Sequence, residues 1–95
     1  MKHFSWNNQK NQILKRERGA SFEEVVFHIE REDLLDIMEL DNQERYPGQR
    51  ILIVNIDNYA YLVPFVESES EVFLKTVIPS RKATNTYLRR REEHG

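Results

Sequence analysis

Two hydrophobic periods divide this chain into helical and extended parts. Residues 7–18 are mostly polar around an apolar pair, which suits a short helix, and Gly19 ends it because glycine readily adopts the left-handed conformation found just past a helix. Ser21 followed by two early glutamates predicts a second helix start, since a serine hydroxyl caps a free amide and carboxylates favour the positive end of the helix dipole. Its apolar face comprises Phe22, Val25, Val26 and Ile29.

The middle of the chain has the pattern of β-strands. Residues 33–40 form an imperfect strand, and residues 49–56 form a clearer one rich in Ile, Leu and Val. The pair Asp57 and Asn58 predicts a tight turn, from which residues 59–66 return as the second strand of a hairpin. A further strand is predicted over residues 72–78.

The two ends of the chain complete the predicted fold. Phe4 and Trp6 alternate with polar residues, as in a short strand or an extended lead-in. Beyond Pro79, a segment rich in Arg, Leu and Glu predicts a closing helix capped by Ser80 or Thr84. We therefore expect an α+β fold with two N-terminal helices, an antiparallel meander of about four strands and a C-terminal helix, with the helices on one face of the sheet.

Length and composition narrow the class of protein. The chain has 95 residues, of which 39% are hydrophobic, so we expect a single domain over residues 1–95. No apolar run approaches the ~20 residues of a membrane span, and the N-terminus has no apolar signal-peptide region. A cytoplasmic protein without a membrane partner is expected. The absence of cysteine, of metal-ligand histidine spacing and of a glycine-rich phosphate loop predicts neither a metal nor another cofactor.

The net charge of −2 conceals a strong segregation. Residues 1–20 carry +4, residues 21–50 carry −6, residues 51–74 carry −4 and residues 75–95 carry +4. Basic ends around an acidic middle fit an anionic partner on one face and a basic partner on another, although solvated faces produce the same pattern.

The basic C-terminal region contains the strongest candidate site. Arg81 and Lys82 follow a strand and open a helix, where free amides and a planar guanidinium suit a phosphodiester. The alternative is that both cations pair with carboxylates such as Glu44. RNA cleavage by attack of the 2′-hydroxyl also needs a proton acceptor, for which Glu44, Lys75 and Tyr87 are candidates.

The order of several short motifs resembles the BrnT family of bacterial toxins. The resemblance covers nearly the whole chain, and its most specific parts are the front pattern and the closing Arg-Lys-Ala-Thr. The motifs are Phe4-x-Trp6-Asn7, Lys10-Asn11, Lys15, Arg18-Gly19-x-Ser21-Phe22-Glu23-Glu24-Val25, Glu44-Arg45-Tyr46 and Ser80-Arg81-Lys82-Ala83-Thr84. The family often has an arginine in the last strand where this chain has Thr76.

The resemblance implies an endoribonuclease toxin with a fold similar to that of RelE-type toxins. It also implies a cognate antitoxin, which we expect to be a ribbon-helix-helix protein. The toxin would bind operator DNA only through this antitoxin. The candidate catalytic residues are Arg81, Lys82, Lys75 and Glu44, and the candidate RNA-binding residues are Lys10, Lys15, Arg18 and Tyr87. The alternative is a protein-binding module, or a degenerate toxin that only binds its antitoxin and helps to repress the operon.

Overall fold

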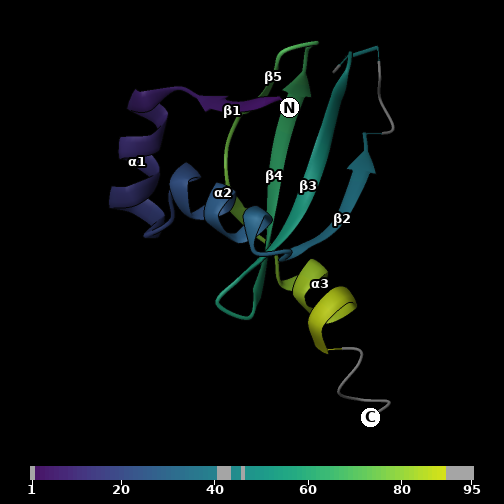
Figure 1. Ribbon diagram of the computed structural model, residues 1–95. Helices are drawn as coiled ribbons and strands as arrows, with labels where there is room; N and C mark the ends of the chain where they lie inside the picture. Colours follow the sequence, from purple (N-terminus) through teal and green to yellow (C-terminus); the bar gives the residue numbers. More distant parts are fainter. Residues whose placement is uncertain (1, 41–43, 46, 90–95) are drawn as a thin grey trace.

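The computed structural model describes residues 2–40, 44–45 and 47–89. The elements in chain order are β1 (His3–Trp6), α1 (Asn8–Arg18), α2 (Phe22–Glu30), β2 (Leu34–Glu39), β3 (Gln49–Ile56), β4 (Tyr59–Glu67), β5 (Glu71–Leu74), β6 (Ile78–Pro79) and α3 (Arg81–Thr84), which continues as a π-helical turn over Asn85–Arg89. This order confirms the predicted α+β class, with two N-terminal helices, then strands, then a C-terminal helix (Figure 1). The predicted continuation of the last helix beyond residue 89 lies outside the described residues.

Local capping fixes both N-terminal helices where the sequence predicts them. Asn7 Oδ1 accepts from the Lys10 amide at 2.9 Å, and Ser21 Oγ accepts from the Glu24 amide at 3.1 Å. At the other end of α1, Gly19 has a φ of 64°, the left-handed conformation that glycine adopts without a side-chain clash.

The sheet is larger and more mixed than the predicted meander. Its strand order is β1-β5-β4-β3-β2. The short strand β6 also pairs with β4 and is not part of this order. The strands β2, β3, β4 and β5 form the expected antiparallel meander. The extended lead-in becomes β1, which pairs parallel with β5 and places Trp6 opposite Leu74 (Figure 1).

The predicted strand over residues 72–78 is interrupted. β5 ends at Leu74, the Lys75 amide still donates to the Pro64 carbonyl at 2.8 Å, and pairing resumes only at Ile78 opposite Leu62. Between these points Val77 is fully buried in the core. The strand is therefore interrupted at the point where the Val77 side chain enters the core.

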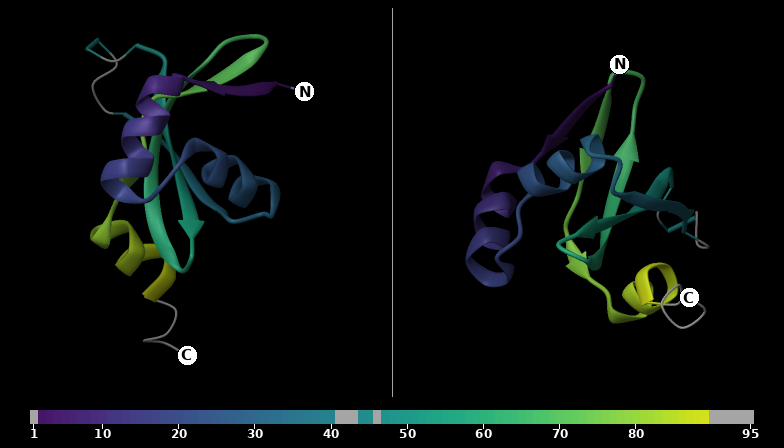
Figure 2. Two further views of the ribbon diagram at one scale, coloured as in Figure 1. Left: turned by 90° about the vertical axis from the view of Figure 1, so that its left-hand side faces the viewer. Right: turned by 60° about the horizontal axis from the view of Figure 1, so that its bottom comes forward.

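Two apolar clusters lie on opposite faces of the sheet. On one face, side chains of α1 and α2 pack on the sheet: Leu14, Phe22, Val25, Leu52, Val54 and Val63 belong to this cluster. On the other face, Ile53 and Ala60 pack with Ala83 of α3. The expectation that all helices cover one face is thus wrong, because successive residues of β3 point to opposite faces and both are apolar. Figure 2 shows α3 apart from α1 and α2, near the end of the sheet where β3 turns into β4.

A buried asparagine joins the two N-terminal helices. Asn11 is 1% exposed, and its Oδ1 accepts from the Phe22 amide at 2.9 Å, the first amide of α2. Its Nδ2 donates to Glu23 Oε1 at 2.7 Å. That hydrogen bond, with a smaller contribution from Lys15, holds the pKa of Glu23 below its ordinary value. Asn11 thereby caps α2 from a neighbouring helix, since the first amides of a helix have no partner within it.

We predict that Asn11→Leu lowers the free energy of unfolding by about 1–3 kcal/mol, because the buried Phe22 amide loses its acceptor. Gln12→Leu, at an exposed position of the same helix, is the matched control and should change stability by less than about 0.5 kcal/mol. Urea unfolding measures both, and NMR titration should show the pKa of Glu23 rising in Asn11→Leu. Equal stability of the two variants would contradict this role for Asn11.

Candidate nucleic-acid interface

The base of α3 is fixed by two hydroxyl side chains. Ser80 Oγ accepts from the Ala83 amide at 3.1 Å, as an N-cap residue does. Thr84, which is 1% exposed, accepts from the Ala60 amide at 2.9 Å and donates to the Ser80 carbonyl at 2.7 Å. These bonds fix α3 against the start of β4 and determine where its cations lie.

Arg81 lines a polar pocket beside α3. The pocket has a volume of about 250 Å³ and is lined by Tyr59, Arg81, Thr84, Asn85 and Arg89, and we call it the arginine pocket. It contains two guanidinium groups and no carboxylate, so its chemistry favours an anion that accepts several hydrogen bonds, such as a phosphate.

Lys82 lines a different and more apolar groove. This groove, about 290 Å³ in volume, is called the Lys82 groove and is lined by Met38, Ile53, Leu62, Ser80, Lys82, Ala83, Thr86 and Tyr87. The adjacent cations Arg81 and Lys82 therefore contribute to different depressions on α3. Among the described residues, Arg81 and Lys82 form no ion pair within 4.0 Å. The structure therefore contradicts the alternative that they pair with carboxylates such as Glu44.

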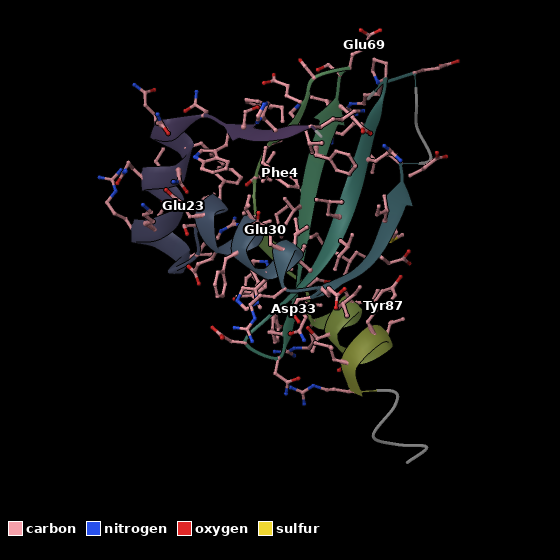
Figure 3. All side chains as sticks on the ribbon, viewed as in Figure 1. Phe4, Glu23, Glu30, Asp33, Glu69 and Tyr87 are labelled. Atoms are coloured by element: carbon pink, nitrogen blue, oxygen red, sulfur yellow. The ribbon has the colours of Figure 1, made fainter. Side chains whose placement is uncertain are left out.

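Tyr87, in the π-helical turn that follows α3, connects this turn to the edge of the sheet (Figure 3). Its hydroxyl donates to Asp36 Oδ2 at 2.5 Å. This bond raises the pKa of the Tyr87 phenol and lowers the pKa of the Asp36 carboxyl. Near neutral pH the phenol is thus held in its protonated form, which suits a proton donor rather than the proton acceptor considered from the sequence.

The other two candidate catalytic residues lie near the opposite end of the sheet. Glu44 is exposed in the connection that precedes β3. The start of β3 lies at one end of the sheet and α3 lies near the other (Figure 1). Lys75 Nζ donates to Oε1 of Gln49, the first residue of β3, at 3.3 Å. The structure therefore does not assemble Arg81, Lys82, Lys75 and Glu44 into one site.

The candidate RNA-binding residues of α1 lie on an element that packs on the other face of the sheet from α3. Lys15 Nζ is 3.7 Å from Glu23 Oε1, and Arg18 Nη1 donates to the Val77 carbonyl at 2.7 Å. Lys10, near the start of the helix, is partly buried. These contacts give Lys15 and Arg18 structural roles, and they leave α3 as the element with cations at two depressions.

Sequence reasoning missed three residues of the arginine pocket. Asn85 and Arg89 lie four and eight positions after Arg81, a spacing that places side chains on one side of a regular helix and could have indicated them. Tyr59 could not have been found, because it is the first residue of β4 and reaches the pocket only through the packing of α3.

Comparison with family models, with curated proteins and with solved structures finds no match to this chain. No helix in the part of the chain that the structure describes is long and apolar enough to cross a membrane. Over the same residues, no three His, Cys, Asp or Glu side chains gather as a metal site would require.

We predict that Thr84→Val lowers the free energy of unfolding by about 1–3 kcal/mol, because the Ala60 amide loses its acceptor without a change in side-chain volume. Thr86→Val is the matched control. Its hydroxyl donates only to the Lys82 carbonyl at an exposed position, so a change below about 0.5 kcal/mol is expected. Thermal and urea unfolding of both variants measure the difference, and a neutral Thr84→Val would show that the hydroxyl does not hold α3.

Proposed function

We propose that this chain is a ribonuclease toxin of a type II toxin-antitoxin pair, similar to BrnT toxins, and that it binds an RNA phosphodiester in the arginine pocket. The arrangement of Arg81 and Arg89 around one polar depression without a carboxylate is the observation that supports this function. A pocket of this composition provides charge and several donors at once, as a phosphate requires.

In this proposal the two guanidinium groups hold the non-bridging oxygens of the scissile phosphate. The neighbouring 2′-hydroxyl gives its proton to water as its oxygen attacks phosphorus and the 2′-oxygen to phosphorus bond forms. The bond from phosphorus to the 5′-oxygen breaks, and this oxygen takes a proton from water, which gives a 2′,3′-cyclic phosphate and a free 5′-hydroxyl. Negative charge grows on the phosphoryl oxygens during this step, so cations already in position lower the barrier. The 2′-hydroxyl also restricts this reaction to RNA.

The partners and location belong to the same proposal. A cognate antitoxin, expected to be a ribbon-helix-helix protein, neutralises the toxin and carries it to operator DNA. The protein acts in the cytoplasm, uses no metal or other cofactor and needs no membrane.

A second function, RNA or antitoxin binding without cleavage, has its own support. The residues that line the arginine pocket include no carboxylate and no imidazole, which are the usual proton acceptors in such a reaction. Two of the three expected acceptors, Glu44 and Lys75, lie near the other end of the sheet. This arrangement favours a protein that retains phosphate binding and has lost turnover.

We predict that Arg81→Ala lowers the rate of RNA cleavage by about 10²–10³-fold, the loss typical for removal of one charge-stabilising donor. Arg16→Ala removes the same charge from an exposed position of α1 and should leave the rate within about twofold. Cleavage of labelled RNA in the presence of a chelator measures the rate, and fluorescence anisotropy measures binding in parallel. Binding of RNA by the parent without cleavage would select the second function, whereas binding and cleavage equal in Arg81→Ala and the parent would exclude the arginine pocket.

Expression in bacteria gives a further prediction. The parent should arrest growth and create new RNA 5′ ends, Arg81→Ala should do neither, and co-expression of the neighbouring reading frame should relieve the arrest. Growth curves and mapping of RNA 5′ ends measure these effects. Normal growth with folded parent protein present would contradict the toxin function.

A further inference from the structure

We propose that the free edge of β2 binds an extended, cationic segment of a partner protein with the side-chain order basic, apolar, apolar, basic. The segment would add to the sheet as a new strand beside β2. This site is separate from the arginine pocket, and the proposal does not depend on RNA cleavage.

The backbone of β2 is available for pairing on one side. β2 is the last strand in the sheet order and pairs only with β3 among the described strands. The Ile37 amide donates to Asp36 Oδ1 at 2.8 Å instead of to a strand. In an antiparallel pair, alternate residues direct their backbone groups toward and away from the partner, so Ile37 and Glu39 face the free edge. An added strand would pair with these two residues.

The side chains of β2 leave apolar surface on both faces of the sheet. Ile37 and Met38 are 46% and 45% exposed, and as neighbours in a strand they point to opposite faces. Met38 lines the Lys82 groove. Ile37 lines a second groove, about 220 Å³ in volume, whose apolar walls include Phe4, Ile29, Leu34, Leu52, Phe65 and Val72. An added strand could therefore bury apolar side chains on each face.

Charge determines which partner fits this edge. Residues 32–40 carry four carboxylates and no basic residue, and two of the four, Asp36 and Glu39, flank the apolar pair directly. Arg50, which lines the groove on the Ile37 face, is engaged by Glu67 and stacks over the Phe65 ring. The edge thus favours a cationic segment, whereas RNA or a second copy of β2 would meet carboxylates of its own sign of charge.

The order of side chains follows from cross-strand pairing. Residues directly opposite one another on neighbouring strands contact on the same face, and pairs of opposite charge or of two apolar groups are favourable. Basic residues opposite Asp36 and Glu39, with apolar residues opposite Ile37 and Met38, satisfy all four positions. Because this order reads the same in both directions, a parallel or an antiparallel segment presents it.

The test uses the full chain labelled with ¹⁵N and a synthetic peptide of about ten residues whose centre reads lysine, isoleucine, valine, lysine. A second peptide of the same composition has the order isoleucine, lysine, lysine, valine at its centre. Binding of the first peptide should shift the amide resonances of Ile37 and Glu39 and slow their hydrogen exchange. The second peptide should bind about fivefold more weakly, because its apolar groups face carboxylates.

Two charge reversals test the site from the protein side. Glu39→Lys should lower the affinity for the first peptide about fivefold to tenfold, because the new lysine repels the basic residue that Glu39 attracts. Glu69→Lys makes the same change of charge in the loop between β4 and β5, near the other end of the sheet from Tyr87 (Figure 3), and should alter affinity less than about twofold. Amide spectra establish that both variants are folded.

Three results would overturn the proposal. One is the absence of binding at about 1 mM peptide. Another is equal affinity of the two peptides or equal weakening by both charge reversals, which indicates unspecific attraction. The third is a set of shifted resonances centred on α3 or α1 instead of on β2.

Discussion

The apolar character of both faces of β3 and β4 is the constraint on which the structure depends. Leu52 and Val54 point to one face and Ile53 to the other, so neither face can be left to water. The N-terminal helices cover one face, and α3 covers the second only near the turn between β3 and β4. This arrangement places the cations of α3 at the end of the sheet and leaves Met38 of β2 45% exposed on the second face. The edge of β2 itself is open because β2 is the last of the described strands in the sheet.

Local signals in the sequence were sufficient for most of the secondary structure. Gly19 ends α1 and Ser21 caps α2 as expected, and Asp57 and Asn58 form the hairpin turn with φ values of 54° and 67°. These features depend on neighbours within a few positions. Three features depend on residues far apart in the chain, and a hydrophobic period cannot specify them. They are the parallel pairing of β1 with β5, the packing of α3 on the second face of the sheet and the burial of Val77.

Only part of the candidate site could be predicted, because its other part also depends on contacts between residues far apart in the chain. Residue chemistry indicated Arg81 as an anion-binding residue, and the structure places it with Arg89 in a polar pocket. Residue chemistry does not indicate at which end of the sheet a candidate lies, and Glu44 and Lys75 lie at the end remote from α3. Arg18 is an RNA-binding candidate by sequence, yet in the fold its guanidinium donates to the Val77 carbonyl between β5 and β6.

Asp36 links the free edge of β2 to the Lys82 groove, which is distinct from the arginine pocket. One carboxylate oxygen accepts from the Ile37 amide at the free edge, and the other accepts from the Tyr87 hydroxyl in the turn that follows α3. A strand that pairs with the Ile37 amide must displace the first oxygen, and a basic side chain opposite Asp36 competes with Tyr87 for the second. Occupation of the β2 edge thus changes the hydrogen bonding of Tyr87 at the border of the Lys82 groove. Coupling between two sites requires such a shared group with different contacts in the two states, and the carboxylate of Asp36 provides one.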